Sequence, residues 1–478
     1  MAKRTLPETP PKARTLEEAQ LLIDELWEQL VEKDQQTKQN SKNSSRPPSS
    51  DSPAHTPPKG VIKRKKSIRS RGAQKGHKGH RRALLPEQEA DAIHQHYCAS
   101  HCDCGGIVQR HQAPDYRHQI FDLPDIQYRM EEHQLFHGHC EHCGQRHRAM
   151  LPDTVSPTQM GAGLLGLCSI LSGQYHLSIG KIKSLMKDVF GISFSTGAWS
   201  QALWQVTPML TRTHQSIHHA VCRDPVLHAD ETRHQRDSEK RWMWLATSQK
   251  FAYFMTHYSR GKEAAKRLLK NHQHDTVIVS DQYASYYWLP DTSHQLCWAH
   301  ILRNLTAIAE CSGTTGHVGK RLVLISLAVF RTRHRYEQEH LKPYEYHRRM
   351  NKLRRYFENE LKQGMSLAMQ KYAGRCERLL KDQAMLWTFL QADNIPLTNN
   401  DAERRLRGYV LWRKGSYGVR SHRGELFRAR ILSFVETCKL QKLSVFASLR
   451  EIISAVIQRK PYPDIFQTEI ATPSRWGG

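Results

Sequence analysis

The sequence lacks any long apolar run. No stretch approaches the roughly 18 uncharged apolar residues of a membrane span, and the N-terminal MAKRTLPETPPKART has no hydrophobic signal core. The hydrophobic fraction is only 38%, yet ten Trp and 17 Tyr indicate folded cores. We therefore expect a soluble, intracellular, multidomain protein with no membrane partner.

Acidic residues are scarce relative to basic ones, with 46 Asp and Glu against 71 Lys and Arg. Residues 59–82 carry eleven Lys or Arg and no acid. Such a run repels itself and favours a polyanion, and nucleic acid fits because neutralised phosphates release counterions. A localisation signal, a solvated tail and anionic membrane binding are the alternatives. The DNA contacts expected in this run are Lys63, Arg64, Lys65, Lys66, Arg69, Arg71, Lys75 and Lys78.

Disulfides are not expected among the eleven Cys, because a reducing compartment favours metal binding or free thiols. The motif CEHCG supplies Cys140 and Cys143, a pair whose spacing suits one ion. The upstream YCASHCDCGG is less regular: His101 with Cys104 restores that spacing, whereas Cys98 with Cys102, or Cys102 with Cys104, uses sulfur only. The two clusters predict a structural Zn²⁺ module with an open choice of first pair, or else unrelated reduced cysteines.

Helical periodicity marks two regions before residue 220. Residues 15–34 place Leu16, Ala19, Ile23, Leu26 and Leu30 at heptad spacing, which predicts a helix that dimerises or packs on its own protein. Residues 158–210 read as helices, with Gly191 as a stop before ISFSTGAWS. That pattern is compatible with a helix-turn-helix and equally with a plain αα-hairpin.

From residue 224 the pattern changes to strands. PVLHAD, KRWMWLATSQ and FAYFMTHY predict a meander of three strands, GKEAAKRLLKNH a helix, DTVIVSD and HQLCW two more strands, and AHILRNLTAI a helix. Three antiparallel strands, a crossover helix and further strands is the order of a ribonuclease H-like core.

Two of these strands are expected to end on acids, at Asp230 and Asp281. Side by side in a sheet, the two carboxylates would converge at one edge, and NNDAERRLR supplies Glu403 as a third acid on a helix. Such an oxygen-rich site suits Mg²⁺ or Mn²⁺ and in-line phosphoryl transfer. Each acid also has a structural explanation: strand ends meet solvent, Asn400 as N-cap would put Glu403 in a capping box, and Asp401 could be the third ligand instead.

Basic residues accompany the acids. On a helix that starts near Asn400, Arg407 and Lys414 share a face with Glu403, so they could contact phosphates, or Arg407 could only pair with Glu403. His300 and Arg303 lie one turn apart after the second acid and could contact DNA or the site, or only cap the sheet.

The predicted fold class is multidomain α+β, with a ribonuclease H-like α/β core and a helical insertion. The predicted segments are a leucine-rich helix (15–34), a disordered linker with the basic run (35–82), a zinc-binding module (83–155), a helical DNA-binding region (156–215), the first part of the core (220–305), the helical insertion (306–392), the second part with the third acid (393–425) and C-terminal helices (426–478).

The chain resembles bacterial DDE transposases of the insertion sequence sixty-six family nearly end to end. The stretches that carry the resemblance are NSKNSSRPPSSD, RGAQKGHKGH, CEHCG, HADET, SDQYASY, CWAHILR and NNDAERRLR. It implies that Asp230, Asp281 and Glu403 are the catalytic acids, and that a leucine-rich helix and a zinc module precede a ribonuclease H-like core. One departure is His101, which stands where the family usually has cysteine.

The resemblance implies a transposase that binds the terminal inverted repeats of its own insertion element and joins them to target DNA in a bacterial cytoplasm, at the nucleoid. Holding two ends together favours a homo-oligomer, and elements of this family tend to encode accessory proteins. The competing functions are a DNA-binding repressor or architectural protein with structural acids, and a ribonuclease H-like nuclease that cuts without joining.

Overall fold

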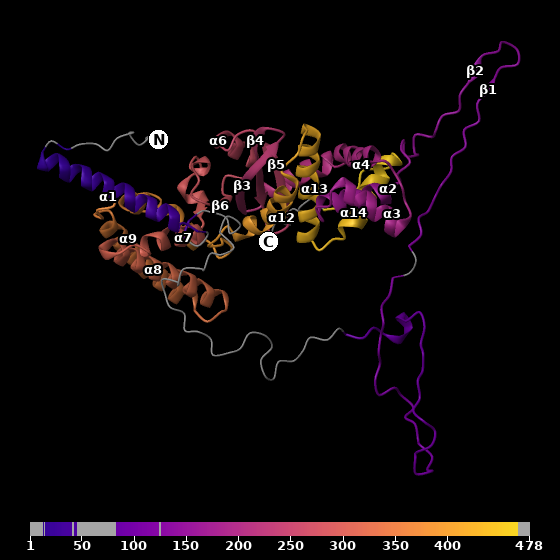
Figure 1. The fold of residues 1–478 in the computed structure, drawn as a ribbon, viewed down its shortest axis with the longest axis horizontal. Coiled ribbons are helices and arrows are strands. Elements are labelled where there is room, and N and C mark those ends of the chain that lie inside the picture. The colour runs from indigo at the N-terminus through magenta and orange to yellow at the C-terminus, as the bar shows by residue number, and fades with distance from the viewer. Residues whose placement is uncertain (1–12, 14, 41–42, 45–82, 124–125, 467–478) are drawn as a thin grey trace, which may run out of the picture.

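The computed structural model describes residues 13, 15–40, 43–44, 83–123 and 126–466 (Figure 1). Its centre is a mixed five-stranded sheet in the order β5-β4-β3-β6-β7. The β3–β4 and β4–β5 pairs are antiparallel, and the β3–β6 and β6–β7 pairs are parallel. This arrangement is compatible with a ribonuclease H-like core and confirms the predicted strand order. The strands are β3 (Val226–Arg236), β4 (Glu239–Thr247), β5 (Ala252–His257), β6 (Val277–Ser280) and β7 (His294–Leu296).

Helices cover both faces of the sheet because the apolar side chains of its strands alternate between two cores. Trp244 and Ala246 of β4 face one core, whereas Met243 and Leu245 face the other. The first core contains residues from α2 (Ala162–Gly173), α3 (Ile179–Phe190), α4 (Thr196–Met209), α5 (Thr211–Val221), α6 (Lys262–Leu268), α13 (His422–Leu440) and α14 (Val445–Ile457). The second contains residues from α12 (Asn400–Ser416).

The helix pair α3–α4 has clear capping residues, among them the predicted stop at Gly191. The hydroxyls of Ser178 and Ser195 accept backbone N–H groups at the first turns of α3 and α4, and Gly191 ends α3 at a φ of 67°. Since α2–α5 share the first core with α13 and α14, this region is packed against one face of the sheet.

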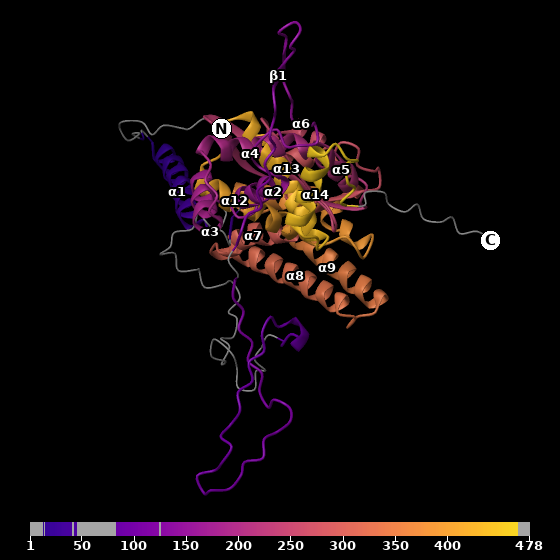
Figure 2. The ribbon, with the colours of Figure 1, turned by 90° about the vertical axis from the view of Figure 1, so that its right-hand side faces the viewer.

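The helical insertion has its own hydrophobic core, to which the helix α7 (Trp298–Ala309) also contributes. Figures 1 and 2 show α8 and α9 as a lobe beside α7. The predicted helical character of 306–392 is thereby confirmed. Its helices are α8 (Gly313–Glu337), α9 (Pro343–Gly364), α10 (Gln370–Lys381) and α11 (Gln383–Leu386), followed by the 3₁₀ turn η5 (Thr388–Leu390). The 3₁₀ turns η3 (Ala284–Tyr286) and η4 (Asp291–Ser293) lie between β6 and β7 along the chain.

The N-terminal part contains one long helix, α1 (Leu16–Lys38), which continues past the predicted end at residue 34. Just beyond it, Asn40 and Asn43 are buried, and the Asn43 amide donates to a Glu310 carboxylate oxygen at 2.6 Å. Residues 83–155 hold the 3₁₀ turn η2 (Glu87–Glu89) and the two-residue strands β1 (Gly138–His139) and β2 (Arg146–His147). Among the described helices, none has the length and apolar character needed to cross a membrane.

Candidate active site

Two of the predicted acids lie at the same level of neighbouring strands. In the parallel β3–β6 pair, His228 is opposite Val279, so Asp230 and Asp281, each two residues further along, come to one level. The expectation that the first strand ends at the acids was wrong, because β3 continues antiparallel to β4 as far as Arg236. Asp281 does directly follow the last residue of β6.

Alternation along β3 separates Asp230 from its neighbour Glu231. The side chains of His228 and Thr232 bond to Asn399 and to Arg413 of α12, so this set of positions, which includes Asp230, faces α12. Glu231 points the other way, where it is buried.

Glu403 lies near the start of α12. The N-cap of this helix is Asn399 rather than Asn400, and the backbone N–H of Glu403 donates to the Asn399 carbonyl at 3.2 Å. A capping box would therefore involve Ala402, so that explanation of Glu403 was wrong. The carboxylate of Glu403 remains available for other partners.

Asn399 connects the segments that carry the acids. It is 1% exposed, and its side-chain amide donates to the Ala229 carbonyl, immediately before Asp230, at 2.8 Å. Its side-chain oxygen accepts from His228 at 3.0 Å, and its backbone N–H donates to the sulfur of Cys297 at 3.1 Å. One buried residue thus fixes the start of α12 against β3 and against the segment that leads into α7.

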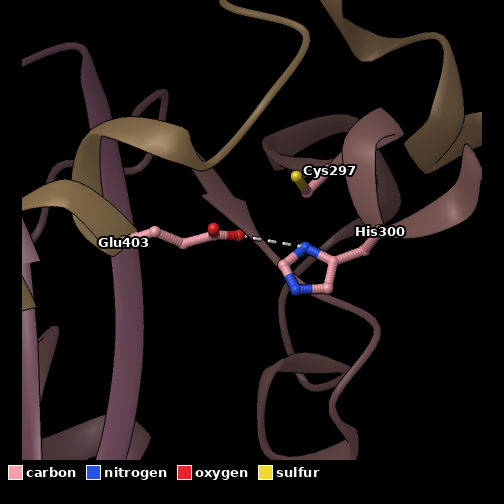
Figure 3. Close-up of side chains that lie close together, drawn as sticks. All are labelled: Cys297, His300 and Glu403. Carbon is pink, nitrogen blue, oxygen red and sulfur yellow. Dashed lines mark ion pairs between the residues drawn. The ribbon is translucent and has the colours of Figure 1, made fainter. Parts of the chain in front are cut away.

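The partners of Glu403 come from α7. Arg303 lies 3.3 Å and His300 Nδ1 3.5 Å from the same Glu403 oxygen, and Figure 3 shows the imidazole directed at it with Cys297 nearby. Burial and the neighbouring Arg303 lower the pKa of His300 to about 3, so its ring is neutral and this contact is polar rather than ionic. The sequence had offered Arg407 as the cation beside Glu403 and Arg303 as a contact of DNA or of the site, and the structure places Arg303 beside Glu403.

Burial raises the pKa of both aspartates. Burial first, and then the charges of Glu231, Asp281 and Glu403, hold the pKa of Asp230 well above its usual range. Burial also raises the pKa of Asp281, which accepts the Tyr283 N–H at 3.0 Å. A cluster of buried carboxylates that repel each other is electrostatically suited to a bound cation.

Glu231 has its own compensating partners on the opposite side of β3. Arg260 donates to it at 2.8 Å and the Tyr286 hydroxyl at 2.8 Å. Burial and the charge of Asp281 nevertheless raise the pKa of Glu231 to about 7. Arg260 is held in place between the rings of Tyr283 and Trp242, with its guanidinium carbon 3.7 and 4.8 Å from their centroids.

The remaining candidates near the acids are arranged differently. Asp401 pairs with Arg404 and Arg405 of its own helix, at 3.4 and 3.1 Å. Arg407 and Lys414 are exposed on α12. In the described part of the chain, Cys297, His300 and Glu403 form a group of metal-binding side chains whose ligand atoms lie within 4.8 Å of one another. Asp230, Asp281 and Glu403 do not form such a group, so their ligand atoms are more widely spaced.

The six zinc candidates are not gathered in one place. Residues 83–123 and the hairpin β1–β2 lie at opposite ends of an extended segment in both views (Figures 1 and 2). Cys140 is half-buried, and the other five side chains are exposed. They are Cys98, His101, Cys102, Cys104, Cys140 and Cys143.

The two cysteine clusters nevertheless form similar turns. The backbone N–H of Cys104 lowers the pKa of Cys102, and the backbone N–H groups of Cys143 and His142 lower that of Cys140. A glycine with positive φ follows each turn, Gly105 at 88° and Gly144 at 73°. The likeness favours Cys102 with Cys104 among the pairs left open by the sequence. The DNA contacts predicted between Lys63 and Lys78 lie outside the described residues.

The comparisons with known proteins identify the family of the chain. The model of the transposase IS66 family matches residues 157–425, more than half of the chain, and the chain belongs to this family. Residues 8–83 match a family of unknown function (DUF6444). No curated protein matches the chain.

Sequence reasoning missed Asn399, Cys297 and Arg260 as parts of the site. Asn399 stood in the quoted motif, but its neighbour Asn400 was given the N-cap role. A buried polar residue directly before a helix that carries an acid was the available signal. For Arg260 no local signal exists, because its partners are Glu231 and two rings that the fold brings together.

Proposed function

We propose that the protein is a DDE transposase that binds the terminal inverted repeats of its element, cuts the DNA and joins the exposed 3′-hydroxyls to target DNA. Asp230, Asp281 and Glu403 are its catalytic acids. The observation that carries this proposal is the parallel register of β3 and β6, which brings Asp230 and Asp281 to one level facing the helix that bears Glu403. Family membership supports the same reaction class.

The donor set fits a hard divalent cation, because all three groups are carboxylates and burial makes ionisation of Asp230 and Asp281 costly. Asp230, Asp281 and Glu403 would hold Mg²⁺ or Mn²⁺. When bound, such ions activate the attacking oxygen and stabilise the leaving one in phosphoryl transfer.

The protein's own residues orient these acids and meet the DNA. Asn399 sets the spacing of β3 and α12, Arg303 donates to the Glu403 carboxylate from the side of α7, and His300 lies beside that carboxylate. Arg303 also offers a cation to a phosphate at the site. The exposed Arg407 and Lys414 contact DNA that runs along α12.

DNA binding outside the core is assigned to three parts of the chain. The basic run 59–82 binds phosphates, the pair α3–α4 reads the ends as a helix-turn-helix, and the zinc module orders on binding Zn²⁺ through Cys140, Cys143, Cys102 and Cys104. The helix α1 exposes Leu16, Ile23, Leu26 and Leu30, which supports pairing of protomers in the active complex. Accessory proteins of the same element could join this complex.

The test is an assay with labelled element ends and target DNA in Mg²⁺, comparing the full-length protein with Asp230→Asn. We expect the variant to bind the ends as well as the wild type and to lose cleavage and joining by at least about a thousandfold, since it removes several kcal/mol of metal-dependent stabilisation. Cleavage without joined product in the wild type would instead identify a nuclease. Unchanged chemistry in the variant would contradict the assignment of the acids.

A further inference from the structure

The helix α9 of the insertion is fixed in place by one face. Tyr346, Met350, Phe357 and Leu361 are buried in the core of the insertion. The ring of Phe357 packs on Trp298 of α7, with 5.3 Å between the centroids. The opposite face of α9 is therefore held outward, on the lobe seen beside α7 in Figures 1 and 2.

The outward face combines cations with aromatic rings. Tyr344, Arg348, Lys352, Arg355 and Tyr356 are all exposed, and the two tyrosines are 74% and 50% exposed. The guanidinium carbon of Arg348 lies 5.9 Å from the Tyr344 ring centroid, and the ammonium nitrogen of Lys352 lies 5.6 Å from that of Tyr356. We call these five residues the basic-aromatic face.

The cations of this face differ from other surface cations nearby. Lys362 pairs with Glu358 at 2.9 Å and Lys381 with Glu377 at 2.7 Å, the usual arrangement of a solvated helix surface. For Arg348, Lys352 and Arg355, the described residues provide no ion pair with an acid. Between Tyr344 and Tyr356 the sequence has a single acid, Glu345. Three unneutralised charges on a rigid helix favour a polyanionic partner.

We propose that the basic-aromatic face of α9 binds the backbone of duplex DNA. This inference rests on the proposed function in taking DNA as the partner, and it adds a contact surface in the insertion, away from the acids. From Tyr344 to Tyr356 the helix spans about 18 Å, a length over which a duplex presents several phosphates. The exposed tyrosines hold the cation stems on the surface and reduce the freedom that the cations lose on binding.

The test measures binding of the full-length protein to a labelled duplex that lacks element ends, over a range of salt concentrations and without added Mg²⁺. The variant is Arg348→Gln with Lys352→Gln and Arg355→Gln. Because each phosphate contact contributes about 0.9 to the slope of log Kd against log salt, we expect the slope to fall by roughly 2 to 3. We also expect binding near 0.1 M salt to weaken by about tenfold or more.

The matched control is Lys362→Gln with Lys381→Gln and Lys439→Gln, which removes the same charge from cations that are paired with acids. Thermal unfolding checks that both variants fold. A much smaller change in the control supports the proposal. Equal losses in the two variants, or wild-type binding by the α9 variant, would overturn it.

Two further arms separate the alternatives. If the α9 variant loses binding to polyglutamate but not to DNA, the partner is an acidic protein and the inference fails. If the wild type performs strand transfer and the α9 variant binds DNA as the wild type does, the proposed function is supported and the proposed DNA-binding surface is contradicted. If the α9 variant loses DNA binding but the wild type neither cuts nor joins element ends, the DNA-binding surface is supported and the proposed transposase function is contradicted.

Discussion

The core around the five-stranded sheet and the segment 83–155 contrast in how their candidate ligands are held. In the core, Asp230 lies on a sheet covered on both faces, Asp281 follows its strand β6 and Glu403 lies on α12, and buried groups such as Asn399 connect these segments. In the segment 83–155, the strands are two residues long and fully exposed, and the cysteine clusters lie apart. The core therefore builds its candidate site from burial and hydrogen bonds, whereas we propose that the other segment folds with the binding energy of a metal.

The largest expected effect tests whether the segment 83–155 folds on binding a metal. We predict that the full chain binds one Zn²⁺ and that Cys140→Ser or Cys102→Ser removes it, with loss of order in the segment, because structural zinc contributes roughly 10 kcal/mol to folding such modules. Metal analysis and hydrogen exchange of the segment measure this. The unfolding of the core should stay unchanged. Zinc retained in the Cys102 variant but lost on Cys98→Ser would show that the first pair was assigned wrongly.

The next effect tests whether buried hydrogen bonds position the acids of the core. Asn399→Ala removes the bond to the Ala229 carbonyl, so we expect cleavage to fall roughly 10- to 100-fold, as for outer residues that orient metal ligands. We also expect more Mg²⁺ to be needed for the half-maximal rate. Rates over a Mg²⁺ titration give both values.

The matched control is Ser433→Ala, which removes a buried hydroxyl that accepts the Phe254 N–H at 2.8 Å, on the part of α13 that packs on β5. It should lower stability without shifting the Mg²⁺ dependence. If both variants shift that dependence equally, Asn399 has no particular role in placing the acids.

The smallest effect concerns Glu231. In the folded protein the pKa of Glu231 is about 7, whereas its usual pKa is 4.5. The folded state therefore binds a proton more tightly than the unfolded state, and the wild type loses stability as the pH rises from about 4.5 to about 7. Glu231→Gln should remove this part of the pH dependence, at most about 3 kcal/mol. Its activity should fall less than about tenfold, because Glu231 faces away from α12. Denaturant unfolding from pH 4.5 to 8 without Mg²⁺ measures the slope, and an unchanged slope would contradict the account.

Local sequence patterns predicted the helices and strands of the core and the neighbouring positions of two acids, Asp230 and Asp281, in its sheet. The strand order followed from apolar runs and short turns, and the neighbouring placement of Asp230 and Asp281 followed from the strand order. The true length of β3 did not, because its second half is polar and is stabilised by distant partners. His234 on β3, for example, bonds to Tyr409 of α12 and lies 3.4 Å from Glu425 of α13.

The surroundings of Glu403 could not be predicted from its neighbours in the sequence. A helical wheel pairs Glu403 with Arg407, but the carboxylate turns instead to Arg303, one hundred residues away along the chain. The role of Asn399 depends on a carbonyl of β3 and a sulfur before α7, neither of which any local pattern indicates. Sequence periodicity identifies which residues share a face, while the partners across that face are set by the tertiary fold.

The most direct test of the central claim, that the core brings three acids together to hold divalent metal, is calorimetric titration of the full chain with Mn²⁺. We expect the wild type to bind and Asp230→Asn, Asp281→Asn and Glu403→Gln each to weaken binding by about tenfold or more, because each removes one charged ligand. Asp401→Asn, whose carboxylate is already paired with arginines of α12, should bind like the wild type. Loss of binding in the Asp401 variant together with normal binding in the Glu403 variant would contradict the account.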